Sequence, residues 1–193
     1  MKTISKVLFA TLVAGTSPAV VYVTNPFNVQ TEDIRPRILG HDIYRIPSRS
    51  MQPTLIPGDY IIISNSAYLK NAPTKGDVIV FKKKSDKKPN EFISYIKRII
   101  AIAGDTIKIS KGTVFINHTP LKEDYIEPNN KKRRYSKFLP ETKVPSGMLY
   151  VLGDNRDNSR DSRLMGFIPE KDVIGKATSI LYGKNKRSGQ QIK

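Results

Sequence analysis

The chain has 193 residues, of which 38% are hydrophobic, so it is long and apolar enough to form one domain with a packed core. Its net charge of +16 favours an anionic partner, either nucleic acid or the headgroups of acidic lipids. It contains no cysteine, which excludes a disulfide framework, a cysteine nucleophile and a cysteine-based zinc site.

The N-terminal residues predict a membrane anchor. Two basic residues, Lys2 and Lys6, precede residues 7–24, an uncharged and mostly apolar run. As a helix this run would span about 27 Å, just enough to cross a bilayer. Residues 17–19 could serve as the cleavage site of a secretory signal, but apolar residues resume after them and favour an uncleaved anchor. The basic residues place a short cytoplasmic N-terminus, residues 1–6, inside and the following domain outside.

The rest of the chain predicts strands. Seven segments are rich in isoleucine, valine, tyrosine and phenylalanine and are separated by glycine, proline or asparagine. These segments are residues 59–64, 77–83, 91–103, 106–110, 113–117, 148–153 and 172–182. The pair Lys111-Gly112 predicts a two-residue hairpin turn between two of them. Residues 41–183 are therefore predicted to form a mainly β domain.

The remaining segments complete the predicted domain organisation. Residues 25–40 are expected to be a linker, and residues 184–193 a basic tail. A small inserted lobe is expected at about residues 106–144. Two basic clusters, residues 82–88 and 131–134, are interpreted as solvated hairpin tips.

A short polar loop, residues 47–55, is the first candidate for chemistry. Its sequence is Pro-Ser-Arg-Ser-Met-Gln-Pro-Thr-Leu, with Ser50 at the centre. Taken alone, a serine-containing stretch between prolines is most often an ordinary turn. The two histidines, His41 and His118, are interpreted as surface or turn residues rather than as the base of a Ser-His-Asp triad. Ser50 would therefore need another base.

Lys97 is the candidate for that base. The charged pair Lys97-Arg98 interrupts a long apolar strand, and alternation places the two side chains on opposite faces. Either both side chains reach solvent from an edge strand, or one of them is buried. Burial in an apolar setting can lower the pKa of a lysine to about 8, which requires roughly 3 kcal/mol of destabilisation of the ammonium. Such a lysine can accept the proton of a serine.

A third unusual segment, residues 153–163, holds three aspartates and three arginines. This balance predicts an internally paired network, because arginine and carboxylate groups form bidentate bonds. A calcium loop is a competing interpretation, since Asp157, Asn158 and Asp161 resemble a set of oxygen ligands. The interleaved arginines disfavour it, and neither a metal nor a cofactor is expected. A solvated surface loop is the third interpretation.

These three segments, in this order and after an apolar N-terminal run, resemble the serine-lysine type I signal peptidases of bacteria, also called leader peptidases. Residues 47–55 are similar to the family's nucleophile box and residues 95–107 to its lysine box. Residues 153–163 with Gly166 are similar to its Gly-Asp-Asn-Arg-Asp box, and the resemblance covers about residues 34–182. It implies antiparallel sheets in a catalytic domain of signal-peptidase type, preceded by one transmembrane helix.

Carried over by position, the resemblance implies roles for single residues. Ser50 would be the nucleophile and Lys97 the general base in a reaction through an acyl-enzyme. Ser48, with the backbone N–H of Ser50, would stabilise the oxyanion. The hydroxyl of Ser159 would orient the neutral lysine. A supporting set would hold the last box against the site: Asp161 and Arg163 as a pair, helped by Asp154 and Arg156.

The chain departs from the family's pattern in a few places. Ala101 and Ala103 stand where the family usually has glycine and proline, which could alter a local bend but removes no catalytic group. The segment Ser64-Asn65 occupies a region where the family often carries a lysine. Arg49 stands between the two serines, where a smaller residue is common. Its effect on access to the oxyanion site is left open.

The resemblance also implies a substrate and a place. The expected substrates are exported preproteins, cut after small residues at the first and third positions before the scissile bond. An extended peptide could bind by adding a strand beside the catalytic loop. The expected location is the bacterial cytoplasmic membrane, with a single span and the β domain on the outer side. There the positive charge would contact anionic lipids, and no nucleic-acid partner is expected.

Two alternatives from other classes stay open. A self-cleaving repressor also uses a serine-lysine dyad on a related β fold, but no helix-turn-helix pattern precedes the candidate site. A catalytically silent, membrane-bound basic module would keep the fold without the chemistry, although both candidate dyad residues are present. Cleavage of a preprotein would distinguish these hypotheses.

Overall fold

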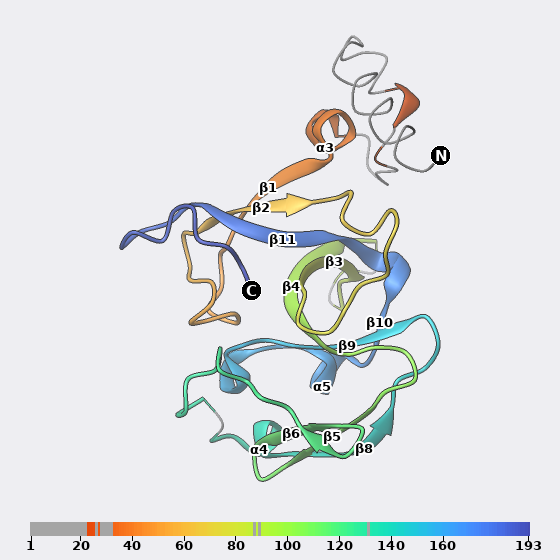
Figure 1. The fold of residues 1–193 in the computed structure, drawn as a ribbon, viewed down its shortest axis with the longest axis vertical. Helices are drawn as coiled ribbons and strands as arrows, with labels where there is room; N and C mark the ends of the chain where they lie inside the picture. Colours follow the sequence, from red (N-terminus) through yellow and green to blue (C-terminus); the bar gives the residue numbers. More distant parts are fainter. Residues whose placement is uncertain (1–22, 26, 28–32, 87, 89, 131) are drawn as a thin grey trace, which may run out of the picture.

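The computed structural model describes residues 23–25, 27, 33–86, 88, 90–130 and 132–193 (Figure 1). Residues 1–6, predicted as a cytoplasmic N-terminus, and most of the anchor predicted at residues 7–24 lie outside these residues. Among the residues described, no helix is both long and apolar enough for a membrane span.

Strands make up most of the described chain. They are β1 (His41–Arg45), β2 (Tyr60–Ser64), β3 (Val78–Lys84), β4 (Phe92–Ala101), β5 (Thr106–Ser110), β6 (Thr113–Ile116), β7 (Thr119–Pro120), β8 (Phe138–Lys143), β9 (Met148–Leu152), β10 (Ile168–Pro169) and β11 (Val173–Tyr182). The helices are short: α3 (Ile34–Leu39), α4 (Arg134–Lys137) and α5 (Ser162–Met165), with 3₁₀ turns at Arg156–Asn158 and Glu170–Asp172.

The strands form two sheets. The larger sheet has the order β1-β2-β11-β3-β4-β9-β10, and the smaller has the order β7-β6-β5-β8. Neighbouring strands are antiparallel in both. The smaller sheet lies at the bottom of Figure 1, below β9. The prediction of a mainly β fold built from antiparallel sheets is confirmed.

Each of the seven segments predicted as strands contains one, but β1, β7, β8 and β10 were not predicted. All four are edge strands, and β8 contains Pro140, which edge strands tolerate. Most side chains of β8 are exposed, and those of β1 alternate between exposed and half-buried. Neither segment therefore has the apolar run that marks a strand in sequence.

The smaller sheet shares a core with the larger one. All its strands fall within residues 106–144, the range predicted for the inserted lobe. Ile107 and Ile109 of β5 are buried in one cluster with Tyr150 and Leu152 of β9. This packing places the lobe against the strand that leads into residues 153–163.

Two buried side chains hold the loop of residues 47–55 in place. Met51 and Leu55 are fully buried and pack with Ile61 and Ile63 of β2. Burial of an aliphatic side chain of this size contributes about 1.5–3 kcal/mol. Ser50 directly precedes Met51, so its position is set by the core of the larger sheet.

The described segments at the two ends of the domain contain further structure. The described part of the predicted linker, residues 25–40, includes α3, which is capped by Gly40 with a φ of 69°. The predicted basic tail, residues 184–193, folds back on β11, and its Ile192 packs against the core that buries Met51.

Candidate active site

Ser50 and Lys97 come together in the folded chain although 47 residues separate them. Ser50 lies in the turn between β1 and β2 and is 8% exposed. Lys97 lies in β4 and is 3% exposed. Its Nζ donates a hydrogen bond to Ser50 Oγ at 2.9 Å and another to the Ile96 carbonyl at 2.6 Å. A nucleophile and a base at this separation can exchange a proton.

The strand that carries Lys97 lies inside the sheet. Its neighbours are β3 and β9, so the alternative of an edge strand with two solvated charges is wrong. Both Lys97 and Arg98 are buried, on opposite faces of the strand. They differ in their partners. Arg98 pairs with the carboxylate of Asp154, whereas Lys97 bonds to the hydroxyl of Ser50 and the carbonyl of Ile96.

Burial changes the charge state of Lys97. Desolvation lowers its pKa from 10.5 to about 8, while the carboxylates of Asp161 and Asp154 act in the opposite direction. Those carboxylates are each engaged by an arginine, so they do not pair with Lys97. The lysine is therefore close to neutral at mildly alkaline pH, which is the state that a base requires.

Ser48 lies beside the reactive hydroxyl. Its side chain is exposed, and its Oγ is 3.2 Å from Ser50 Oγ. In the described part of the chain, the backbone N–H of Ser50 has no backbone acceptor. The two groups predicted to stabilise an oxyanion are thus both adjacent to Ser50 Oγ, and the N–H is available for a new acceptor.

Ser159 and Gly153 close one side of the site. Ser159 is 6% exposed, and its Oγ has no hydrogen-bond partner among the described residues, so the predicted bond to Lys97 is not formed in this structure. A Cβ added at Gly153 would overlap both Ser159 Oγ and the Ser50 carbonyl oxygen. Only glycine allows these two segments to approach so closely.

Replacing Gly153 by alanine is expected to lower cleavage at least tenfold and to destabilise the fold by about 1–3 kcal/mol, because the new methyl group must displace the Ser50 backbone. Cleavage rate and thermal unfolding would measure the two effects. Gly147→Ala is the matched control: Gly147 has a φ of 69° and open space around it, so this change strains the backbone without moving Ser50. Equal activity of both variants would contradict the prediction.

The charges of residues 153–163 pair differently from the prediction. Only Asp161 and Arg163 pair with each other, at 2.7 and 2.8 Å. The other partners lie outside the segment: Asp154 pairs with Arg98, Arg156 with Glu123 and Arg160 with Asp86. The prediction of an internally paired network is therefore largely wrong. The segment packs between β4 and the smaller lobe, where oppositely charged groups from other elements reach it.

The pair Asp161–Arg163 holds the last box in its conformation. Asp161 Oδ2 accepts from the Gly153 N–H at 3.0 Å, and its Oδ1 accepts from the N–H of Arg163 at the start of α5. One carboxylate therefore ties the end of β9 to α5. Arg163 also donates to Ser136 Oγ of α4 at 3.1 Å, which connects the box to the lobe.

Asp157 makes contacts that differ from those of a calcium ligand. Its carboxylate accepts from the backbone N–H groups of Lys132 and Arg133, at 2.7 and 3.0 Å. Within the residues that the structure describes, no group of three or more histidine or acidic side chains could hold a metal ion. Asp157 joins the last box to the lobe instead.

Several residues of the site had no role in the sequence-based prediction. Asn155 donates from its backbone to the Ser50 carbonyl and from its side chain to the Arg49 carbonyl, both at 3.1 Å. The guanidinium of Arg98 donates two hydrogen bonds to the carboxylate of Asp154, at 2.9 and 2.7 Å, and Thr54 Oγ1 donates to the same carboxylate. Asn155 and Arg98 stand inside the recognised boxes, so their positions were visible, but nothing in the sequence indicated which atoms they would bind.

The three unusual residues of the boxes have clear surroundings. Arg49 is exposed, and its carbonyl rather than its charge engages the last box. Ala101 is fully buried and follows a register shift in the pairing with β9 that begins at Ile99. Strand β4 is therefore irregular at this point although alanine stands where the family usually has glycine. Ala103 is exposed in the turn that follows.

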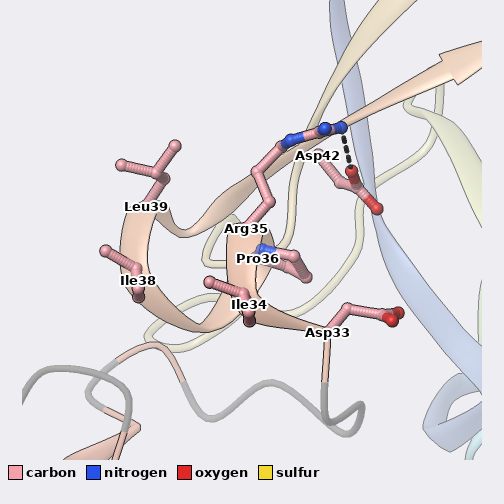
Figure 2. Close-up of a pocket in the computed structure, with 7 residues that line it drawn as sticks. All are labelled: Asp33, Ile34, Arg35, Pro36, Ile38, Leu39 and Asp42. Carbon is pink, nitrogen blue, oxygen red and sulfur yellow. Dashed lines mark hydrogen bonds and ion pairs between the residues drawn. The ribbon is translucent and has the colours of Figure 1, made fainter. Parts of the chain in front are cut away.

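A separate hollow lies beside α3 (Figure 2). Arg35 and Asp42 form an ion pair at its edge, at 3.2 Å. Its wall is lined by Asp33, Ile34, Arg35, Pro36, Ile38, Leu39 and Asp42. None of these is a predicted site residue, and none carries a hydroxyl or thiol that could act as a nucleophile.

Comparison with known proteins identifies the family. Residues 33–182 match the family described as signal peptidase, peptidase S26. The chain is 40% identical over 142 residues to a probable signal peptidase I-1 of Synechocystis sp., covering 68% of this chain and 66% of that protein. It is 39% identical over 146 residues to a signal peptidase I of Leptolyngbya laminosa, covering 73% and 68%. The chain thus spans about two thirds of the length of these relatives.

A solved structure of a signal peptidase I from Enterococcus faecalis V583 is 30% identical and matches 55% of this chain and 97% of its own, with a TM-score of 0.43. The sequence matches confirm the predicted resemblance. They show that the chain belongs to the bacterial type I signal peptidases, peptidase family S26.

Proposed function

We propose that this protein is a serine endopeptidase that removes signal peptides from exported preproteins with a Ser50–Lys97 dyad. The observation that carries the proposal is the contact between a buried lysine of lowered pKa and a serine hydroxyl. Family membership supports the substrate class, since the relatives are named signal peptidases. The dyad itself rests on the geometry.

The first half of the proposed reaction forms an acyl-enzyme. Neutral Lys97 Nζ accepts the proton of Ser50 Oγ as the oxygen attacks the scissile carbonyl carbon. The Ile96 carbonyl accepts an N–H from the same nitrogen, which turns the lone pair toward Ser50. The hydroxyl of Ser48 and the N–H of Ser50 donate to the tetrahedral oxyanion. The ammonium of Lys97 then gives its proton to the leaving amine, and an ester on Ser50 is left.

The second half hydrolyses that ester. Lys97 accepts a proton from water as the water attacks the ester carbonyl, and returns it to Ser50 Oγ when the acid product leaves. The hydroxyl of Ser159, buried beside Gly153 and without a partner among the described residues, is proposed to orient the neutral lysine. Asp154, Arg156, Asp161 and Arg163 act as supports that hold the last box against Ser50.

The proposed location is the bacterial cytoplasmic membrane. Residues 7–24 would form a single span, with the catalytic domain on the outer side. Ile34 and Leu39 of α3, which follows that segment along the chain, have exposed apolar side chains. The charge of +16 would attract anionic lipid headgroups.

Incubation of the purified full-length protein in detergent with a preprotein tests the proposed function. The expected product is one mature chain whose new N-terminus follows small residues at the first and third positions before the cut. Absence of cleavage would favour the silent module. Cleavage of the protein itself but not of the preprotein would favour the repressor-like hypothesis.

The proposed chemistry predicts a pH dependence. Because neutral Lys97 is the active form and its pKa is lowered to about 8, kcat/KM is expected to rise with pH through about 8. Below that point it should fall about tenfold for each pH unit. A profile of kcat/KM between pH 6 and 10 provides the measurement. A rate that is constant from pH 6 to pH 9 would contradict a lysine base.

A further inference from the structure

The C-terminal segment, residues 183–193, contacts the loop that carries Ser50 on its C-terminal side, at Pro53, Thr54 and Asp59. It folds back along β11, where the N–H of Gly189 donates to the Ile180 carbonyl at 2.7 Å and the N–H of Ile192 donates to the Thr178 carbonyl at 2.9 Å. Figure 1 shows the end of the chain returning toward the middle of the molecule. This path brings Arg187 to the loop that carries Ser50.

Arg187 joins this segment to the catalytic loop through its guanidinium. Its Nη2 donates to the Thr54 carbonyl at 2.6 Å and to Asp59 Oδ2 at 3.0 Å, and its Nη1 lies 3.4 Å from the Pro53 carbonyl. The side chain is only 18% exposed. A guanidinium holds several acceptors in a fixed geometry, so it fixes both ends of the loop segment between Pro53 and Asp59.

A second contact connects the same segment to the last box. The main-chain oxygen of Lys193 accepts from Arg98 Nη1 at 2.6 Å. Arg98 also donates two hydrogen bonds to the carboxylate of Asp154, which accepts a hydrogen bond from the Thr54 hydroxyl. The C-terminal segment therefore meets Thr54 by two routes, one through Arg187 and one through Arg98.

The loop between Thr54 and Ser50 can transmit a displacement because it is internally bonded. The N–H of Leu55 donates to the Met51 carbonyl at 2.9 Å, and the N–H of Gln52 donates to the Arg49 carbonyl at 3.2 Å. A turn closed in this way moves as a unit. Misplacement of a reacting atom by about 1 Å can lower a rate about 100-fold.

We propose that Arg187 is a positioning residue, which holds the loop so that Ser50 Oγ stays within reach of Lys97 Nζ. This inference rests on the proposed function, since it assigns Arg187 a part in the same reaction. It also assigns the C-terminal segment a function: this segment is a brace for the nucleophile and not a solvated basic tail.

The test compares Arg187→Ala with the wild-type full-length protein in detergent, on a preprotein, with rates expressed per titrated active site. We expect kcat to fall about 10–100-fold, because the loop that positions the Ser50 hydroxyl is loosened. KM should change less than about twofold, because Arg187 contacts this loop and not the substrate. The acid limb of the pH profile should move upward from about 8, because a loosened loop admits water to Lys97. Arg187→Lys should recover part of kcat, since an ammonium can hold one of the acceptors.

Lys184→Ala is the matched control, because it removes an exposed positive charge from the same segment. It should leave kcat, KM and the pH profile unchanged. A purely structural role for Arg187 would lower the melting temperature and the number of active sites but leave kcat per site and the acid limb as in the wild type. That result would overturn the proposal.

Hydrogen exchange separates this proposal from the proposed function. In Arg187→Ala the amides of Gln52 and Leu55 should exchange at least tenfold faster, while those of β5 and β6 should not change. If the wild-type protein cleaves no preprotein, the proposed function fails, and the exchange data still decide whether Arg187 braces the loop. Unchanged exchange at the amides of Gln52 and Leu55 would contradict the brace.

Discussion

Replacing Ser50 by alanine is expected to lower kcat/KM for preprotein cleavage by about 10⁴-fold or more, because no other hydroxyl lies on Lys97 Nζ in the described structure. Lys97→Met should lower it by a similar factor, since methionine has a similar shape but cannot accept a proton. The double variant should be no worse than either single variant, because the two residues act as a unit. Initial rates with one preprotein provide the measurement.

The stability of the same variants gives an independent check. The folded-state pKa of Lys97 is lowered, so its destabilising effect is fully present below about pH 8 and disappears as the pH rises toward 10.5. Lys97→Met should therefore stabilise the fold by about 1–3 kcal/mol at neutral pH. Ser50→Ala should change stability little. Cleavage that survives either substitution would contradict the dyad, and a destabilised Lys97→Met would contradict the burial of an unpaired lysine.

Removing the buried carboxylate of Asp154 is expected to destabilise the fold by about 3–5 kcal/mol. Asp154→Ala would leave the charge of Arg98 buried without a counterion, since the two side chains are 0% and 2% exposed and bonded at 2.7 Å. It would also free the hydroxyl of Thr54. Denaturant unfolding measures the change, and activity should fall with it because Thr54 belongs to the catalytic loop.

A double variant separates the cost of the unpaired Arg98 charge from other losses of stability caused by Asp154→Ala. Arg98→Met in the Asp154→Ala background should recover part of the lost stability, because the uncompensated charge is gone. The recovery is incomplete, since the carbonyls of Gly76 and Lys193 then lose their donor. The exposed pair Arg160–Asp86 is the control, and Arg160→Ala should change stability by less than about 1 kcal/mol. Equal effects at the buried and exposed pairs would contradict the prediction.

Lys97 and Arg98 show how the partner decides the chemistry of a buried cation. Arg98 donates two hydrogen bonds to the carboxylate of Asp154, which serves as its counterion. Lys97 has only neutral partners, so desolvation is the larger effect and its pKa falls. Two neighbouring residues of one strand thereby take different parts, one as a support and one as the candidate base.

The sequence predicted most of the strands because their pattern is local. Alternation of apolar residues and the glycine, proline and asparagine between them mark β2 to β6, β9 and β11 over a few residues each. Edge strands such as β1 and β8 lack a buried face, so this signal is absent. The three family boxes were likewise visible, because each is a short run of specific residues.

Local patterns also made Ser50 and Lys97 candidates for chemistry, and the family resemblance supplied their expected roles. An apolar segment around a lysine indicates low polarity before any fold is known, and the missing histidine partner left a serine in need of a base. The sequence alone therefore determined the residue types of the site, the mainly β class and the family resemblance.

Only the tertiary structure decided which charged groups meet. Arg98 and Asp154 are 56 residues apart, and Arg156 and Glu123 are 33 apart, and each could have paired with several other charges. The same holds for Arg187, which is 133 residues from Thr54 and was assigned to a tail. The strength of such pairs depends on burial and distance, and both are set by how the sheets pack, which no pattern within a few residues of the chain contains.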